Sequence, residues 1–292
     1  MAHFSPLCSP LTPAEVLKLI TSSSLKYSPV DIVPVQLIKS CPLLFAEIIS
    51  VVANLSFTHG RFPSDYKQTS ITPILKKSGL DSSVPANYRP ISNLSTVAKI
   101  IERLFLSRIQ KHVFSCSNFN KNQSAYCRYH STETALLSTL DHLIHAADCG
   151  KSTLLVSLDL SAAFDTIDHN ILLNRLHHSF GISGSVHQWL ESYLVGRTQF
   201  VRLGSFTSDP VDLTCGVPQG SGLGPLLFTI YTSPISHITS SYGVNQQQYA
   251  DDTQLFIALS PGDHLNEIAN LESCLQSLSI WFSLNGLALN SS

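Results

Sequence analysis

The segment QQYADDTQLFIAL (247–259) constrains the fold of this chain more than any other stretch of its sequence. It predicts a strand, a two-residue turn and a second strand, which together form an antiparallel hairpin. Asp251 and Asp252 lie side by side between the two strands. Because Asp tolerates the left-handed backbone of a hairpin tip, the pair taken alone indicates only a turn.

The other predicted strands all precede this hairpin in the sequence. The apolar, β-branched run TLLVSLDL (153–160) predicts a short strand that closes on Asp159. Further strand signals are SITPIL (70–75) and the alternation over 199–213, which indicates a hairpin. A Gly-rich loop follows at 216–224.

Helical spacing accounts for most of the remaining sequence. Thr12, Pro13 and Glu15 form the pattern of a capping box at the first helix. The predicted helices span 13–20, 34–57 with a break or new start at Pro42, 96–113, 131–148, 168–180, 185–194, 225–238 and 264–283. Short strands separated by helices predict an α+β (mixed α/β) fold, with helices mostly on one face of the sheet.

Two of these helices carry an apolar face at helical spacing. In 96–113 the face consists of Val97, Ile100, Ile101, Leu104, Phe105, Ile109 and Val113, with cations on the other side. In 264–283 it consists of Leu265, Ile268, Leu271, Leu275, Leu278 and Trp281, and the helix is expected to end at Asn285-Gly286.

Composition excludes several classes of protein. Of the 292 residues, 43% are hydrophobic and 13% are charged, which suits a buried core and excludes a disordered chain. No apolar run is long enough for a membrane span and the start lacks a signal-peptide pattern, so no membrane partner is expected. The seven Cys are scattered without a CxxC pair, which disfavours disulfides and zinc knuckles and suits a reducing, intracellular compartment.

The net charge of −2 conceals a segregation of charge along the chain. Residues 61–128 contain 11 Lys and Arg but 3 Asp and Glu, whereas residues 129–292 contain 4 and 14. A basic region joined to an acidic one suits a phosphate-facing surface beside a carboxylate-rich one, although two ordinary solvated surfaces would produce the same counts.

The acidic residues at the ends of the predicted strands indicate a function when they are considered together. Asp159 alone is explained as a strand-end cap, but a cluster of Asp159, Asp251 and Asp252 is costly unless a cation neutralises it. Oxygen ligands select Mg²⁺ or Mn²⁺, and two such ions can activate an attacking hydroxyl and stabilise a leaving pyrophosphate. The combination therefore points to phosphoryl or nucleotidyl transfer.

Six segments, in this order along the chain, resemble sequence motifs of a known family. The three catalytic motifs of reverse transcriptases resemble VSLDLSAAFDTIDH (156–169), CGVPQGSGLGPLLF (215–228) and QYADDTQLF (248–256). Their finger motifs resemble NYRPISNLS (87–95) and QSAYCRYHSTETALL (123–137), and their fourth palm motif resembles WFSLNGLALN (281–290). The residues of these motifs are most similar to those of LINE-type (non-LTR) retrotransposons of the Jockey-like group, and the resemblance covers nearly the whole chain.

The resemblance implies a right-hand polymerase fold with fingers and a palm whose antiparallel sheet is backed by helices. The N-terminal extension would span 1–70, the fingers 71–150 and the palm 151–292, with a finger insertion at about 180–222. It also implies an RNA-directed DNA polymerase. In that reaction the 3′-OH of a DNA primer on an RNA template attacks the α-phosphate of a dNTP, aided by two Mg²⁺ or Mn²⁺ ions.

The resemblance also implies a role for each matching position. The catalytic and metal-binding residues would be Asp159, Asp251 and Asp252, with the Leu160 carbonyl as a further metal ligand. The nucleotide-binding residues would be Arg89, Gln219, Phe164, the backbone at Ala162 and Ala163, and Lys76 or Lys77. The template and primer contacts would come from Gly220, Tyr249 and Ala250.

Some of these residues have a simpler explanation when they are taken alone. Phe164 would be a core aromatic, whereas in the motif it lies under the sugar and excludes a 2′-OH, which selects deoxynucleotides. Arg89 would be a surface charge, whereas in the motif it binds the triphosphate as a fixed guanidinium fork. The Gly-rich loop lacks the GK[ST] of a P-loop, so its glycines are expected to allow close approach of a nucleic acid strand.

Three departures from the family pattern define the alternatives. Gly222 replaces a bulky apolar residue, and Cys127 replaces a cation. The sequence also stops at Ser292 before the Lys-containing segment and the thumb, and no endonuclease precedes the fingers, so a fragment of a larger polyprotein is expected. One alternative is an inactive remnant that only binds nucleic acid. Another is an RNA-directed RNA polymerase, against which Phe164 argues.

The expected location of the protein is nuclear for target-primed synthesis, or cytoplasmic before import.

Overall fold

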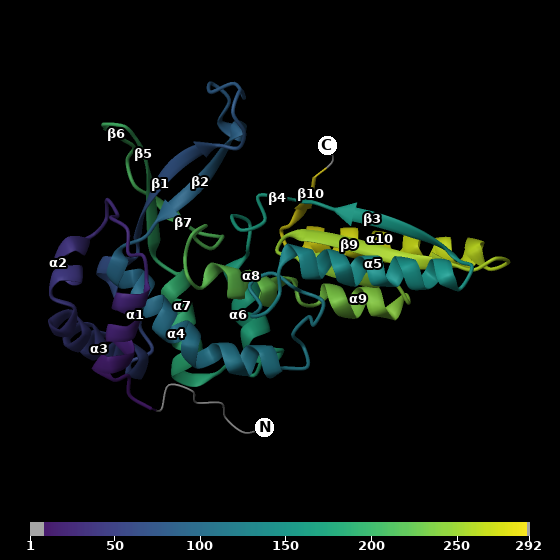
Figure 1. The fold of residues 1–292 in the computed structure, drawn as a ribbon. Coiled ribbons are helices and arrows are strands. Elements are labelled where there is room, and N and C mark those ends of the chain that lie inside the picture. Colours follow the sequence, from purple (N-terminus) through teal and green to yellow (C-terminus); the bar gives the residue numbers. More distant parts are fainter. Residues whose placement is uncertain (1–8, 291–292) are drawn as a thin grey trace. The chain divides into compact units, whose positions relative to one another are not determined.

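The chain folds into two compact units, each assembled from two separate stretches of sequence. The computed structural model describes residues 9–290. The first unit comprises residues 1–114 and 173–224, and the second comprises 115–172 and 225–292. Both units contain helices and strands, which confirms the mixed α/β class (Figure 1).

The first unit combines a group of helices with a small sheet. Its helices are α1 (Pro13–Ser22), α2 (Val35–Ser40), α3 (Pro42–Thr58), α4 (Thr96–Ser115) and α7 (Gly184–Leu194), with short 3-10 turns η2 (Ser64–Tyr66) and η3 (Pro85–Asn87). Its strands are β1 (Gln68–Leu75), β2 (Tyr88–Asn93), β5 (Arg197–Leu203), β6 (Phe206–Thr207) and β7 (Val211–Leu213). The boundaries between the units fall at the end of α4, within α6 (His169–His178) and at the start of α8 (Gly224–Thr232).

The sheet of the first unit mixes two kinds of pairing. β1 pairs antiparallel with β2 and parallel with β5, and β5 pairs antiparallel with both β6 and β7. The hairpin predicted over 199–213 is confirmed. β2 was not predicted, because Pro90 and the turn-rich residues before it conceal a strand whose partner, β1, supplies the pairing.

An aromatic core lies among α3, α4 and α7. The Trp189 ring stacks on Phe105 with 3.8 Å between centroids, and its Nε1 donates a hydrogen bond to the Ser56 hydroxyl at 2.8 Å. All seven apolar positions predicted on α4 are buried. The capping box of Thr12 and Glu15 on α1 is also present as predicted.

α4 also buries a carboxylate that its apolar pattern did not predict. Glu102 is fully buried and accepts hydrogen bonds from the Tyr193 hydroxyl at 3.0 Å and from the Gly222 N–H at 2.6 Å. Burial raises the pKa of the Glu102 carboxyl, and the charge of buried Arg197 opposes that rise. Within the described residues, Nε and Nη2 of Arg197 have no hydrogen-bond partner, and Arg197 and Glu102 form no ion pair. The two groups therefore interact only through their charges.

The second unit is built on a three-stranded antiparallel sheet in the order β3–β9–β8. Its strands are β3 (Ser152–Leu158), β8 (Asn245–Tyr249) and β9 (Asp252–Leu259), and a separate short pair joins β4 (Leu160–Ser161) to β10 (Ala288–Leu289). Its helices are α5 (Thr132–Asp148), α9 (Ile235–Ser241), α10 (His264–Leu284) and all of α8 after Gly224, together with the start of α6. The antiparallel hairpin predicted over 247–259 is therefore confirmed.

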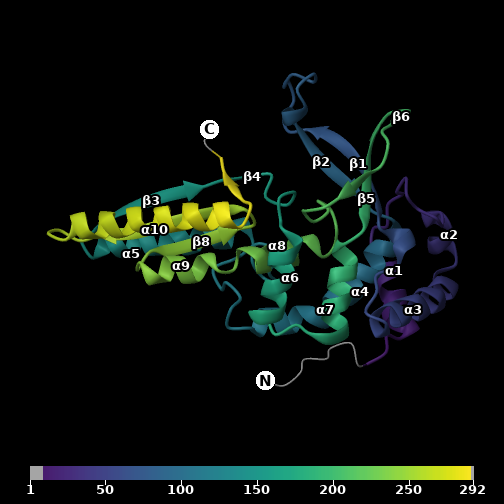
Figure 2. The same ribbon diagram turned by 180° about the vertical axis from the view of Figure 1, so that it is seen from behind.

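Helices cover both faces of this sheet. On one face, Thr139 of α5 donates a hydrogen bond to Gln254 and His142 of α5 packs against Phe256. α10 lies on the other face: α5 is in front of the sheet in Figure 1, and α10 is in front of it when seen from behind in Figure 2. The prediction that helices lie mostly on one face is wrong, because β9 buries apolar residues on both of its faces.

Two predicted helices differ in detail from their sequence pattern. The helix expected over 225–238 is divided by Pro234 into α8 and α9. α10 ends at Asn285-Gly286 as predicted, but its buried face is rotated, so Leu265 is exposed. The buried residues of α10 are Leu271, Cys274, Leu278 and Phe282.

β8 carries three consecutive buried glutamines. The side-chain amide of Gln246 donates to the Asn120 amide oxygen at 2.9 Å, and that of Gln247 donates to the Ser124 hydroxyl at 2.8 Å. The Gln248 amide donates to the Thr253 hydroxyl at 2.9 Å. These bonds join β8 to the segment 120–124 and to β9. Among the described residues, Oε1 of Gln246 is buried without a hydrogen-bond partner, so the polar groups of this strand are satisfied only in part.

No helix within residues 9–290 is both long enough and apolar enough to cross a membrane.

Candidate active site

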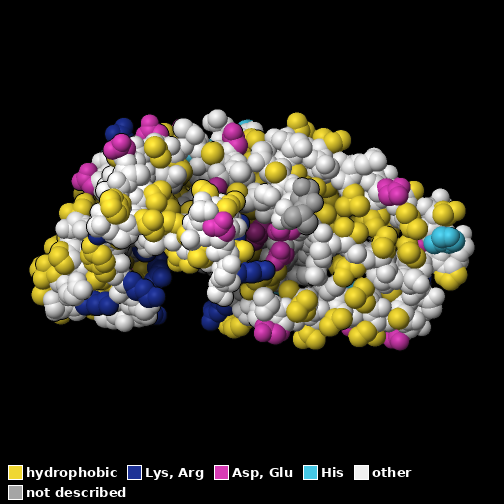
Figure 3. Space-filling model, turned by 90° about the horizontal axis from the view of Figure 1, so that it is seen from above, with side chains coloured by type: hydrophobic (Ala, Val, Ile, Leu, Met, Phe, Trp, Pro, Cys, Tyr) yellow, Lys and Arg dark blue, Asp and Glu magenta, His cyan; other side chains and the backbone are white. Residues whose placement is uncertain are grey.

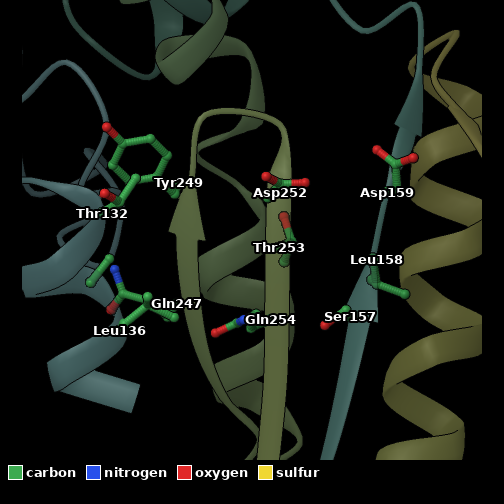
Figure 4. A pocket seen from close by; sticks show the side chains of 11 residues that line it. Thr132, Leu136, Ser157, Leu158, Asp159, Gln247, Tyr249, Asp252, Thr253 and Gln254 are labelled. Carbon is green, nitrogen blue, oxygen red and sulfur yellow. The ribbon is translucent and has the colours of Figure 1, made fainter. Parts of the chain in front are cut away.

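Asp159 and Asp252 lie at the same end of two neighbouring strands. β3 ends at Leu158, which pairs with Thr253 of β9, so the next residue, Asp159, comes opposite Asp252. Figure 4 shows both carboxylates at that end of the sheet, on adjacent strands. The sequence predicted this cluster, and the antiparallel register is its structural cause.

The turn between β8 and β9 consists of Ala250 and Asp251, because Tyr249 and Asp252 already form a strand pair. Ala250 has a φ of 57° and is the only residue of this turn with positive φ. The prediction that the two Asp form the turn is therefore wrong: Asp252 begins β9, and Ala250 rather than Asp has the left-handed backbone. A left-handed backbone costs a residue with a Cβ about 1–2 kcal/mol, so neighbouring contacts must hold it.

The charges of Asp251 and Asp159 act on Asp252. The pKa of Asp252 is raised first by burial and then by the charges of Asp251 and Asp159. None of the three forms an ion pair with a Lys, Arg or His of the part of the chain that the structure describes. Figure 3 shows a gathering of Asp and Glu side chains on the face that it draws.

These donors suit a hard divalent cation in chemistry and in charge, since they are oxygen ligands without a protein counter-ion. Across residues 9–290, however, no three His, Cys, Asp or Glu side chains are grouped closely enough to hold one metal ion. The carboxylates therefore fit a cation as a set of donors, and the two-ion site expected from the sequence remains a proposal.

Asn290 contacts Asp159, and the sequence pattern does not predict this contact. Its side-chain amide donates to Oδ2 of Asp159 at 2.9 Å, and its backbone N–H donates to the Asp159 carbonyl at 2.8 Å. The pairing of β10 with β4 brings Asn290 there. The signal was present in WFSLNGLALN (281–290), but the resemblance alone does not say which residue of that motif reaches Asp159.

The residues after Asp159 form a compact turn. Leu160 and Ala163 are buried, and Ala162 is exposed with a φ of 50°. The Phe164 ring is half-buried and stacks on Phe228 with 4.7 Å between centroids. One face of Phe164 is therefore fixed by the core.

A cavity of about 330 Å³ adjoins the carboxylates. It is lined by Asp159 and Asp252, by Tyr249 and by the first turn of α5, where Thr132 and Leu136 lie (Figure 4). Tyr249 is half-buried at this cavity. The two residues assigned by resemblance to the primer end, Tyr249 and Ala250, are thus adjacent to the carboxylate pair.

The remaining assigned residues belong to the first unit. Arg89 of β2 is exposed and pairs in register with Ile74, and the Lys76 N–H donates to the Asn87 carbonyl. Lys76 and Lys77 both lie beyond the end of β1, so the register of β1 with β2 does not choose between them.

The Gly-rich loop lies against the same strand. The Ser92 N–H donates to the Gln219 carbonyl at 2.9 Å, and a Cβ on Gly220 would lie 3.0 Å from the Ser92 carbonyl oxygen. The first unit therefore brings Lys76, Arg89, Gln219 and Gly220 to the β1–β2 hairpin. The second unit brings together the three carboxylates, Tyr249 and Ala250.

Gly220 is the glycine of this loop whose replacement is expected to matter most. It has a φ of 117° and a backbone contact that an added Cβ would break, so Gly220→Ala should lower the free energy of unfolding by about 1–3 kcal/mol. Gly204→Ala is the control, because Gly204 has a φ of 61° with nothing within 4 Å of an added Cβ. Urea unfolding of both variants measures the difference, and equal losses would show that the contact with Ser92 is unimportant.

Comparison with known proteins decides the family. The model of the family "Reverse transcriptase (RNA-dependent DNA polymerase)" matches residues 74–292. The chain belongs to the reverse transcriptase family. The resemblance noted in the sequence is thereby confirmed, and with it the class of enzyme to which this reverse transcriptase domain belongs. Reverse transcriptases use divalent metal ions, in keeping with the donors described above.

Three curated relatives of the reverse transcriptase domain come from mobile elements of Drosophila melanogaster. It is 29% identical to a probable RNA-directed DNA polymerase from transposon BS, over 93% of this chain and 30% of that protein. It is 30% identical to the corresponding protein of the X-element, over 84% of the chain and 27% of that protein. The RNA-directed DNA polymerase from mobile element jockey is 29% identical, over 84% of the chain and 27% of that protein.

These relatives agree with the Jockey-like, non-LTR group expected from the motifs. The chain spans about 30% of the length of the transposon BS protein, so properties of the longer proteins do not pass directly to it.

Proposed function

We propose that this reverse transcriptase domain transfers deoxynucleotides to the 3′-OH of a DNA primer on an RNA template. The observation that carries the proposal is the convergence of Asp159 with Asp252 of β9, directly after Asp251 of the turn, at one end of an antiparallel sheet. Like charges kept together without a protein counter-ion suit phosphoryl chemistry with cations. The family match supports the same reaction.

In this proposal the residues of the second unit orient the reacting groups. Asp159 and Asp251 hold the divalent cations, Asp252 adds a third carboxylate, and the Leu160 carbonyl adds a further oxygen. When bound, two Mg²⁺ or Mn²⁺ ions would activate the primer 3′-OH and stabilise the leaving pyrophosphate. Asn290 keeps Oδ2 of Asp159 in one direction by its hydrogen bond.

The resemblance assigns nucleotide contacts within each unit separately. In the first unit, Arg89 and Lys76 or Lys77 would supply positive charge for the triphosphate. In the second unit, the backbone at Ala162 and Ala163 would face the nucleotide. Gln219 contacts the incoming nucleotide and Gly220 the template strand. In this scheme the fingers lie within 71–150 and the palm within 151–292, with a finger insertion at about 180–222, and synthesis at a chromosomal target would take place in the nucleus.

Primer extension tests the proposal. The purified chain is given an RNA template, an annealed DNA primer, dNTPs and either Mg²⁺ or Mn²⁺, and the products are separated by length. Extension that requires the RNA template supports the proposal. Binding of the template–primer duplex without any extension would instead support a remnant that binds nucleic acid but has lost turnover.

Replacing Phe164 should change the choice of sugar. One ring face is fixed on Phe228, so a smaller residue opens the space in which a 2′-OH would lie. We expect Phe164→Val to raise the use of rNTPs relative to dNTPs by roughly 10- to 100-fold, the range that one steric contact provides. The ratio of kcat/KM for the two nucleotides measures this, and Phe164→Tyr, which keeps the ring, should retain the discrimination of the wild-type chain.

A further inference from the structure

Gln123 contacts the turn between β8 and β9 although it lies far away in the sequence. Its side-chain Nε2 donates a hydrogen bond to the Ala250 carbonyl at 3.0 Å, and its Oε1 accepts one from the Ala250 N–H at 3.0 Å. The side chain is 2% exposed. A single amide therefore satisfies both backbone groups of the residue that precedes Asp251.

The direction of this side chain is fixed by the backbone on either side of it. The Asn122 carbonyl accepts a hydrogen bond from the Gln248 N–H at 2.9 Å, and the Ser124 N–H donates one to the Gln248 carbonyl at 2.9 Å. These two bonds form a parallel bridge between Gln123 and Gln248. In addition, Oε1 of Gln123 accepts from the Ala125 N–H at 3.0 Å. These bonds fix the position of Gln123 independently of its hydrogen bonds to the turn.

Ala250 is the residue of the turn that needs such a contact. Its φ of 57° is unfavourable for a residue with a Cβ, and a two-residue turn has few internal contacts that could maintain it. Asp251 follows directly in the chain, so a change in the backbone of Ala250 redirects the Asp251 carboxylate. Loss of the Gln123 amide would leave a donor and an acceptor unpaired at this point.

We propose that Gln123 is a positioning residue for the catalytic turn, which keeps Ala250 in its left-handed conformation and thereby sets the direction of Asp251. The consequence for catalysis rests on the function proposed above. The consequence for the turn does not, because it concerns only backbone hydrogen bonds of the free chain.

Hydrogen exchange tests the effect on the turn. Gln123→Met keeps the length of the side chain and removes both hydrogen bonds. Gln246→Met is the matched control, because Gln246 is also a buried glutamine of this unit but contacts Asn120 and not the turn. In peptides covering 249–252, we expect exchange to be about tenfold faster in Gln123→Met than in Gln246→Met, after both are corrected for global stability. Equal exchange rates in the two variants would overturn the proposal.

Kinetics and rescue separate positioning from a general loss of structure. We expect Gln123→Met to lower kcat by about 10- to 100-fold with little change in the KM for dNTP, since a misplaced catalytic group affects the reaction step. Adding Ala250→Gly, which relieves the cost of positive φ, should restore part of the native exchange protection and of kcat. Failure of the second change to restore either property contradicts the proposal. If the wild-type chain shows no extension, the proposed function fails, and the exchange experiment still decides the role of Gln123.

Discussion

Replacing Asp251 by Asn should lower the rate of primer extension by about three orders of magnitude while leaving the fold at least as stable as that of the wild-type chain. Asn keeps the size of the side chain but loses the charge that binds a divalent cation. If that interaction contributes about 4 kcal/mol to the transition state, the rate falls on the order of 10³-fold, at 1.36 kcal/mol for each factor of ten. Single-nucleotide incorporation on a primed RNA template measures the loss.

Because the variant is expected to remain folded, a loss of activity can be assigned to the missing carboxylate and not to unfolding. The charge of Asp251 helps to raise the pKa of Asp252, so its removal relieves repulsion among the carboxylates. The midpoint of thermal unfolding should therefore stay unchanged or rise slightly. Asp209→Asn is the control, because Asp209 is exposed in a loop of the first unit and should retain full activity. Unfolding of Asp251→Asn at a lower temperature would contradict this assignment.

Removing the carboxylate of Glu102 should cause the largest loss of stability among the changes considered. Glu102→Ala leaves the Gly222 N–H and the Tyr193 hydroxyl without their acceptor, and it leaves the buried Arg197 guanidinium without a compensating charge. Leaving each of these buried groups without its partner costs about 1–3 kcal/mol. Urea unfolding of the purified variant measures the difference in free energy.

Two companion variants identify the cause of that loss. Tyr193→Phe removes one hydrogen bond to Glu102 and keeps the ring stacked on Trp189, so it should cost only about 1 kcal/mol. In the double variant of Glu102→Leu with Arg197→Leu neither charge remains, so it should be more stable than Glu102→Ala. If the double variant is the less stable of the two, uncompensated charge is not the cause of the loss.

Local patterns in the sequence predicted much of this fold correctly. The capping box at Thr12, the buried face of α4 and the hairpin of β8 and β9 each depend on residues a few positions apart, and each is present. The same applies to the cluster of Asp159 with Asp252, because a strand-end Asp and a hairpin Asp meet once two strands pair in register. Such features follow from periodicity and from turn chemistry.

Features that depend on distant residues were not predicted. β2 forms because β1 pairs with it, and the β1–β5 pairing joins segments at 68–71 and 198–201. Gln123 and Asn290 reach the candidate site across 127 and 131 residues respectively, and no local pattern marks either contact. The burial of Glu102 is of the same kind, since its partners are Tyr193 and Gly222.

The turn between β8 and β9 was predicted incorrectly for a different reason. Asp is more tolerant of positive φ than Ala, so propensity assigned the left-handed position to the Asp pair. In the structure Ala250 occupies it, with both of its backbone groups bonded to Gln123. A tertiary contact thus outweighed a local preference at the position where the carboxylates are directed, which is where such exceptions are expected.

The three buried glutamines of β8 affect how the catalytic hairpin selects its alignment. A slip of one residue moves every side chain of a strand to the opposite face, and in most strands this exchanges apolar for polar groups and is rejected. Within a run of identical residues, a slip of one position replaces each glutamine by another glutamine, so the run itself does not disfavour the shifted alignment. The shifted alignment is disfavoured only by the residues at the two ends of the run, where buried Val244 precedes the strand and Tyr249 pairs with Asp252. The alignment of Asp252 with Asp159 thus depends on a few unlike residues at the ends of a uniform stretch.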